Sequence, residues 1–311
     1  MSGFFPHSLF FDFPLIFSPQ QMATRGHFAY HFDKSAYARI GVMPRHGTSA
    51  AQIKWFDVDP CFMFHVSNAY EERDADGNTT VVVFGCRFED FNLTLRDIDT
   101  DYLAESQTYH EWRLPLGKWD GSAGGIGADA AAARTASSSS KGFPVALERE
   151  VLPFACDFPA IHPARVGRRH RFAWLPRMAT TTGPAAPLMD RVVKYDHEGG
   201  RVVGEIAFGP GRYGGECVYV PRPRPGDAGG AWPPPPPPSG ADEDDGWLIT
   251  FIYDQHAKAS EFVVFDARTM ASEPVAVVAL PQRVPYGFHG TWIPASERAK
   301  MEGVGAMRSR L

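Results

Sequence analysis

Two of the eleven histidines differ from the others because bulky apolar residues surround them in the sequence. His65 lies in the run Phe-Met-Phe-His-Val-Ser, and His289 lies in Pro-Tyr-Gly-Phe-His-Gly. A buried imidazole needs partners for its ring nitrogens, and a metal ion is one such partner. A hydrogen-bonded core histidine is the alternative explanation for each of them. These two residues could therefore serve a metal centre or the packing of strands.

The common signatures of other chemistries are absent from the sequence. There is no P-loop, G-x-G-x-x-G, H-E-x-x-H or G-x-S-x-G pattern, which argues against the usual nucleotide-binding, zinc-peptidase and serine-hydrolase sites. The formal net charge of −5 comes without a long basic run, so no nucleic-acid surface is expected. Four widely spaced cysteines without a C-x-x-C pair argue against a disulfide framework. Residues 1–19 match neither a signal peptide nor a membrane span, and no transmembrane segment is expected.

Strands are the elements that would have to position these histidines. Short β-branched and aromatic segments recur with turn residues between them, which predicts an all-β protein. Several units end a strand on an acidic residue, as at Asp33, Asp196 and Asp266. Successive blades of a β-propeller would have this appearance. The predicted strands are Gln52–Val58, Thr80–Phe84, Arg171–Leu175, Trp247–Tyr253 and Glu261–Asp266.

Two stretches of low complexity interrupt this pattern, at about 117–141 and about 222–245. The first is rich in Gly, Ala and Ser, and the second contains six consecutive prolines followed by an acidic run. Neither composition can bury enough apolar surface to offset its ordering entropy, so both are expected to be mobile surface insertions. The proline run could instead serve as a polyproline II ligand for an aromatic groove.

Five segments, in this order, resemble the carotenoid cleavage dioxygenases, and the resemblance extends from about residue 10 to about residue 295. Their sequences are most similar to those of the plant enzymes that cut near the 9,10 double bond or that cleave apocarotenoids. The segments are Arg-Ile-Gly-Val-Met-Pro-Arg from Arg39, Ile-Lys-Trp-Phe-Asp from Ile53, Phe-His-Val-Ser-Asn-Ala-Tyr-Glu-Glu from Phe64, Phe-Gly-Pro-Gly-Arg-Tyr-Gly-Gly-Glu from Phe208 and Arg-Val-Pro-Tyr-Gly-Phe-His-Gly from Arg283.

The resemblance implies a seven-bladed β-propeller that holds Fe(II) on its axis with four histidines, and residues 1–311 would be a partial propeller domain, truncated at its N-terminus. His65 matches the third ligand and His289 the fourth, whereas the first two would lie upstream. His7 does not match a ligand position. Neutral imidazoles suit ferrous iron and leave positions open for dioxygen.

Carboxylates that orient the ligand imidazoles are also implied by the resemblance. Glu216 matches one of these positions, and Asp157 stands where a glutamate is expected, with a side chain one methylene shorter. The glycines before Glu216 would let the backbone turn sharply and approach the axis. Alternatively, Glu216 could cap a turn and Asp157 could be a surface turn residue.

The implied function is cleavage of one conjugated double bond of a carotenoid or apocarotenoid by dioxygen, giving two carbonyl products. Phe64, Tyr286 and Phe288, beside the matched ligands, could line an apolar substrate tunnel or belong to the core. Peripheral membrane contact for substrate uptake and a cytoplasmic or plastid location are compatible with this function.

Two imidazoles cannot make a four-nitrogen site, and this leaves two further readings of the sequence. One is a catalytically silent family member, whose exposed sheet edges would invite partner pairing. The other is an incomplete version of a longer protein, which the start inside a family strand favours.

Overall fold

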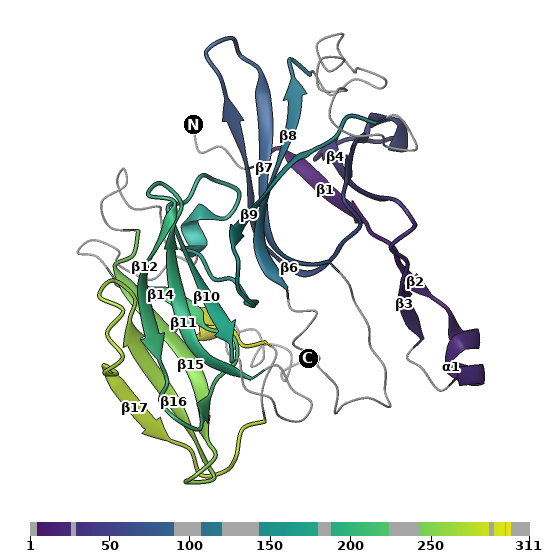
Figure 1. Ribbon diagram of the computed structural model, residues 1–311. Helices are drawn as coiled ribbons and strands as arrows, with labels where there is room; N and C mark the ends of the chain where they lie inside the picture. Colours follow the sequence, from purple (N-terminus) through teal and green to yellow (C-terminus); the bar gives the residue numbers. More distant parts are fainter. Residues whose placement is uncertain are drawn as a thin grey trace, which may run out of the picture. The chain divides into compact units, whose positions relative to one another are not determined.

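The structure is a computed structural model that describes residues 5–25, 29–89, 107–119, 143–179, 188–223, 243–285, 289–295 and 297–299. Within these ranges almost every regular element is a β-strand, as Figure 1 shows. The helical elements with defined bounds are α1 (Pro19–Arg25) and two short 3-10 turns, Ala50–Gln52 and Pro163–Arg165, and the described residues 295 and 297–299 are also helical. The prediction of an all-β protein is therefore confirmed.

The chain divides into two compact units. The N-terminal unit comprises Met1–Asp157, Gly167–Arg169 and Thr180–Pro187. The C-terminal unit comprises Phe158–Val166, His170–Ala179 and Leu188–Leu311. Each unit has its own cluster of buried side chains, so each can be described by itself.

The N-terminal unit contains three antiparallel sheets (Figure 1). Its four-stranded sheet is a meander in which consecutive strands are neighbours, the arrangement expected of a propeller blade. The four strands are β6 (Phe62–Arg73), β7 (Thr79–Phe88), β8 (Thr108–Gly117) and β9 (Leu147–Leu152). The other sheets are β1 (His7–Asp12), β4 (Ala38–Pro44) and β5 (Lys54–Val58), and the hairpin of β2 (Leu15–Phe17) with β3 (Tyr30–Phe32).

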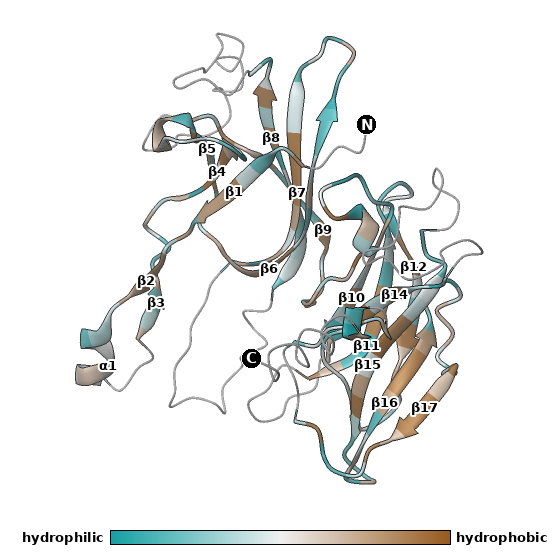
Figure 2. Cartoon of the chain, turned by 180° about the vertical axis from the view of Figure 1, so that it is seen from behind, coloured by the Kyte–Doolittle hydropathy of each residue, from teal (hydrophilic) through white to brown (hydrophobic). Residues whose placement is uncertain are grey.

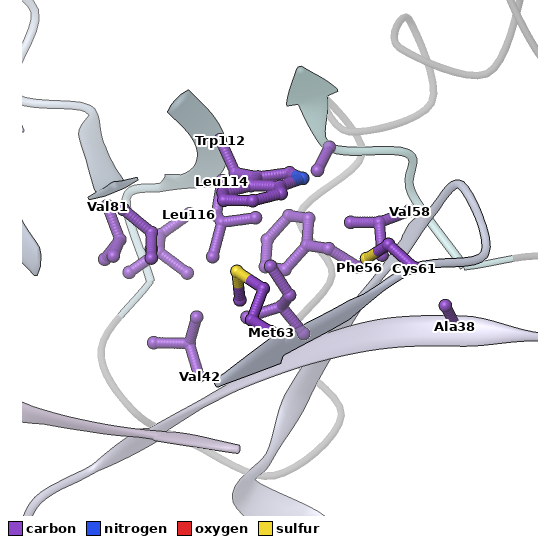
Figure 3. Close-up of a cluster of buried hydrophobic side chains, with 13 residues drawn as sticks. Ala38, Val42, Phe56, Val58, Cys61, Met63, Val81, Trp112, Leu114 and Leu116 are labelled. Atoms are coloured by element: carbon purple, nitrogen blue, oxygen red, sulfur yellow. The ribbon is translucent and has the colours of Figure 1, made fainter. Parts of the chain in front are cut away.

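The core of the N-terminal unit is built from side chains of the sheet β1–β4–β5 and of the four-stranded sheet, and Figure 3 shows part of this cluster. Phe56 of β5, Trp112 of β8 and Met63 of β6 contribute large side chains to it, and the first two are fully buried. Burying one such side chain stabilises the fold by about 1.5–3 kcal/mol. The core therefore fixes the backbone of β6 immediately before His65.

The C-terminal unit contains two antiparallel sheets (Figure 1). The buried side chains of Leu248, Ile252, Val263 and Phe265 belong to its core. Figure 2 shows apolar colouring along its last three strands in sequence, which are β15, β16 and β17. The first sheet is β10 (Phe172–Met178), β11 (Met189–Asp196) and β12 (Arg201–Ala207). The second is β13 (Arg212–Tyr213), β14 (Val218–Pro221), β15 (Gly246–Asp254), β16 (Ala259–Asp266) and β17 (Ala276–Ala279).

The acidic residues at the predicted strand ends have a common structural role. Asp33 accepts a hydrogen bond from the backbone N–H of Ser35, and Asp196 and Asp266 each accept from two backbone N–H groups of the following turn. Hydrogen bonds to the ionised carboxylate lower its pKa. At Asp33 the bonds from Ser35 are the main cause of the lowered pKa. At Asp196 and Asp266 burial opposes the shift, but the pKa is still lowered, and the turn bonds contribute to this. The repeated acidic endings are therefore turn caps.

The two predicted insertions lie mostly outside the described residues, but the end of the second one belongs to the fold. Glu243 is only 2% exposed and accepts hydrogen bonds from the backbone of Arg171 and Phe172, at 2.8 and 2.9 Å. Lys194 pairs with Asp244 at 2.6 Å. The expectation of a solvated acidic run is thus wrong for Glu243, because the burial of its carboxylate is matched by backbone donors and by Arg165.

Among the described residues, none of the helices has the length and apolar character needed to cross a membrane.

Candidate metal centre

His65 lies on β6 where this strand departs from regular pairing with β7. Met63 pairs with Arg87, Val66 with Gly85 and Asn68 with Phe84, so β6 uses two more residues than β7 over this stretch. A bulge of this kind changes the direction of a side chain that would otherwise alternate regularly along the strand. The local irregularity therefore sets the direction in which the His65 imidazole points.

Gly85 makes room for this bulge, and the sequence did not single it out. A Cβ atom built on Gly85 would lie 2.8 Å from the sulfur of Met63 and 3.1 Å from the carbonyl oxygen of His65. Both distances are tighter than ordinary van der Waals contact. The glycine thus allows the His65 backbone to approach β7 closely.

The His65 imidazole is held by a buried carboxylate. Its Nδ1 lies 2.9 Å from Oδ1 of Asp157, whose side chain is only 3% exposed. The reading of Asp157 as a surface turn residue is therefore wrong. The shorter aspartate thus reaches a matched ligand histidine, and it favours the tautomer with a proton on Nδ1. Nε2 is then the ring nitrogen able to ligate a metal.

Asp157 has further partners in the N-terminal unit that the sequence did not indicate. Gln107 donates from Nε2 to Oδ2 of Asp157 at 2.9 Å, and the Gln107 side chain is itself buried. The Cys86 thiol lies in hydrogen-bonding contact with Asp157 and Cys156. Burial, together with these two neighbours, raises the pKa of the Cys86 thiol well above its ordinary value. A protonated thiol and an amide therefore face the carboxylate.

In the C-terminal unit, Glu216 contacts His289 and the residue after it. Oε1 of Glu216 lies 3.6 Å from Nδ1 of His289, and Oε2 accepts a 2.6 Å hydrogen bond from the backbone N–H of Gly290. Glu216 thus acts on a segment 73 residues away in sequence rather than only on its own turn. As at His65, the carboxylate lies nearest to Nδ1 and leaves Nε2 as the ring nitrogen for a ligand.

The glycine-rich segment before Glu216 has the backbone that its sequence predicts. Gly209 and Gly211 adopt φ values of +99° and +70°, which residues with a side chain rarely adopt. Gly214 is needed for a different reason, since its Cβ would lie 2.8 Å from the Phe208 ring. Arg212 secures this segment through an ion pair with Glu261 at 2.6 Å.

A cavity of about 170 Å³ lies beside Glu216 and His289. Aromatic side chains of β15 and β16 contribute to its wall, including Phe251 and Phe262. Phe158, which the sequence did not indicate, packs edge-on against the His289 ring with the centroids 5.6 Å apart. Phe158 directly follows Asp157 and has a positive φ of 51°, an uncommon conformation that is typical of constrained functional segments.

The aromatic residues predicted for a tunnel can be assessed only in part. Phe64 is 51% exposed, so the core alternative does not hold for it, and its ring packs on those of Phe62 and Phe88. Tyr286 and Phe288 lie outside the described residues. His7, which was not assigned as a ligand, pairs with Glu71 at 2.8 Å and stacks on Trp119.

The two candidate ligands fit an iron site as donors but do not complete one. Asp157 lies within hydrogen-bonding distance of Nδ1 of His65, the arrangement that raises the basicity of a metal ligand, whereas Glu216 lies 3.6 Å from Nδ1 of His289. The described residues contain no cluster of three or more His, Cys, Asp or Glu side chains able to hold a metal. Any iron bound by His65 or His289 would therefore need further donors.

The antiparallel sheets of both units fit a propeller-type fold. The chain matches the cobalt-substituted Synechocystis apocarotenoid oxygenase with a TM-score of 0.67 and 23% identity, over 92% of this chain and 51% of the other. The predicted propeller-type fold is therefore confirmed.

Residues 6–294 match the family described as RPE65, retinal pigment epithelial membrane protein, and the chain belongs to this family of carotenoid oxygenases. It is 33% identical over 301 residues to the carotenoid 9,10(9',10')-cleavage dioxygenase of Crocus sativus and 32% identical over 304 residues to the corresponding enzyme 1 of Arabidopsis thaliana. Each match covers 92% of this chain and 46% of the relative. The chain thus spans about half the length of these curated relatives.

Proposed function

We propose that this chain contributes to a non-haem Fe(II) centre that cleaves one conjugated double bond of a carotenoid or apocarotenoid. Both atoms of O₂ would be inserted across the bond, so that each carbon of the former double bond becomes a carbonyl carbon. The observation that carries the proposal is the carboxylate at Nδ1 of each matched histidine, at 2.9 Å for His65 and 3.6 Å for His289.

In this proposal the chain supplies two ligands. His65 and His289 would hold the iron through Nε2, while Asp157 keeps Nδ1 of His65 protonated and its ring fixed, and Glu216 lies beside Nδ1 of His289. Bound ferrous iron would supply the activation of dioxygen that no amino-acid side chain can provide. Fixing the imidazoles in advance reduces the reorganisation needed when the metal binds.

The aromatic cluster near His65, of which Phe64 is exposed, suits an apolar polyene. Phe62, Phe64 and Phe88 form a contiguous ring cluster in the N-terminal unit, and the Phe64 and His65 rings lie 6.2 Å apart. Such a surface would bind a hydrocarbon chain and exclude water from it. Tyr286 and Phe288 remain proposed tunnel residues from the sequence alone.

The subgroup and the location are part of the same proposal. The 9,10 specificity printed for the Crocus and Arabidopsis relatives supports a plant-type cleavage of a carotenoid or apocarotenoid. Other relatives are described as chloroplastic, which favours a plastid location over the cytoplasm. Peripheral contact with a membrane would give access to such lipophilic substrates.

The test measures bound iron and cleavage of an apocarotenal by the purified chain with ferrous iron and air. Where further donors complete the site, we expect iron to bind and carbonyl products to form, and both to be lost in the separate variants His65→Ala and His289→Ala. The exposed His46, changed to alanine, is the matched control and should retain both. Iron binding and turnover that survive either ligand substitution would contradict the assignment, and a wild-type chain that binds no iron would contradict the proposal for this chain.

A further inference from the structure

Gln107 holds the segment of Asp157 at two points. Its main-chain carbonyl oxygen accepts a 3.0 Å hydrogen bond from the backbone N–H of Cys156. Its side-chain Nε2 donates to Oδ2 of Asp157 at 2.9 Å. Gln107 is 3% exposed and Asp157 is 2% exposed, so water does not compete for these bonds. One residue thus fixes both the backbone and the carboxylate of this segment.

The two oxygens of Asp157 have different partners, and this determines the rotation of the carboxylate. Oδ1 lies against Nδ1 of His65, while Oδ2 accepts from Gln107. Without the amide donor, Oδ2 would lose a hydrogen bond in a buried position, which costs about 1–3 kcal/mol. The carboxylate could then turn away from His65 to find other donors.

Of the two polar atoms of the Gln107 side-chain amide, only Nε2 makes a hydrogen bond among the described residues. Its Oε1 atom is buried and accepts no hydrogen bond within the described part of the chain. Reversing the amide would place this oxygen against the Asp157 carboxylate, which is electrostatically unfavourable. A buried amide with an unsatisfied oxygen is a poor choice for stability alone, because an apolar residue would avoid that cost. The hydrogen bond that the amide donates to Asp157 therefore explains why a glutamine suits this position.

We propose that Gln107 is a positioning residue: through Asp157 it fixes the tautomer and the ring orientation of His65. The contacts of Gln107 are independent of the proposed iron-binding function, but the use of a fixed His65 ring rests on that proposed function. It accounts for a specific departure of this chain, in which an aspartate occupies a position expected to hold the longer glutamate. The amide holds the shorter carboxylate in the one orientation that meets the histidine.

The decisive variant is Gln107→Met, which keeps the approximate length of the side chain and removes the donor. In the metal-free chain, the ¹⁵N signals of the His65 ring should show Nδ1 protonated in the wild type. In the variant the Nδ1–H form should decrease and its proton should exchange with water about tenfold faster or more. Fe(II) or Co(II) affinity should fall by about 10–100-fold. Gln20→Met, on the exposed face of α1, is the matched control and should change neither quantity.

The two readouts separate this inference from the proposed function. Unchanged His65 ring signals in a folded Gln107→Met chain would overturn the positioning role, even if the wild type binds iron. A changed ring tautomer in a chain that binds no metal would support the positioning role while the iron proposal fails. If Gln107→Met does not fold, the wild type still decides, because the Nε2 protons of Gln107 should exchange at least about tenfold more slowly than those of Gln20. Equal exchange would overturn the inference.

Discussion

Asp157 is shorter by one methylene than the glutamate expected at its position, yet it lies 2.9 Å from both His65 and Gln107. The site around it is filled, since the Asp157 side chain is only 3% exposed. Restoring the longer residue would therefore push atoms together rather than improve the contact. In our proposal, Gln107 is the residue that fits this site to aspartate.

We predict that Asp157→Glu destabilises the chain by about 1–3 kcal/mol, because an extra methylene in a closely packed interior forces strained side-chain or backbone positions. The measurement is the free energy of unfolding in urea. Asp76→Glu, in the exposed β6–β7 turn, is the control and should change it by less than about 0.5 kcal/mol. An Asp157→Glu chain as stable as the wild type would show that the site has space for glutamate.

His170 is expected to make the stability of the C-terminal unit depend on pH. Burial, the nearby His197 and Arg165 lower the pKa of His170 well below its ordinary value, and the two imidazole rings are 4.5 Å apart. In the unfolded chain this histidine should titrate near pH 6.5. Between the two pKa values only the unfolded chain binds the proton, so stability present above about pH 6.5 is lost as the pH falls.

We therefore expect the urea midpoint to decrease between pH 7.5 and pH 5, and His170→Gln to reduce that decrease. Glutamine keeps a polar group of similar size but does not titrate. The matched control is His46→Gln at an exposed position, which should leave the pH dependence unchanged. The explanation fails if His170→Gln and the wild type lose stability in parallel over this range.

At the scale of elements, the bulge in β6 is what separates His65 from an ordinary strand residue. Gly85→Ala should destabilise the N-terminal unit by about 1–3 kcal/mol, because the new methyl group meets Met63 and the His65 carbonyl. The cost should be smaller in a Met63→Ala background, where one of the two contacts is gone. A double-mutant cycle measured by urea unfolding gives this coupling, and equal costs in both backgrounds would argue against the contact.

Most strands could be predicted from the sequence, since alternation and turn residues are local signals. The segments predicted around Thr80, Arg171, Trp247 and Glu261 correspond to β7, β10, β15 and β16. The contacts of the site could not be predicted in the same way. Asp157 lies 92 residues from His65 and 50 from Gln107, and no pattern within a strand reports such distances. The resemblance supplied His65, Asp157, Glu216 and His289, whereas Gln107 and Gly85 became evident only from packing.

At the scale of the whole molecule, the chain combines two separately cored units with a length about half that of its curated relatives. Within the C-terminal unit, β17 borders its sheet and pairs with β16 as its one partner among the described strands. All four residues of β17 are exposed and apolar, and no charge interrupts them. An uncharged edge of this kind is open to pairing with a further strand.

We predict that the isolated chain self-associates through β17 and that Val277→Lys reduces this association. Val277 is 47% exposed, and a lysine there would place a charge on the apolar edge, a device by which edge strands resist pairing. Sedimentation at increasing concentration should show a rising average mass for the wild type and a nearly constant mass for the variant. Val166→Lys replaces an exposed valine outside any strand and should behave as the wild type. Equal association in Val277→Lys and the wild type would exclude β17 as the contact, and the exposed Phe64 would be the next position to change.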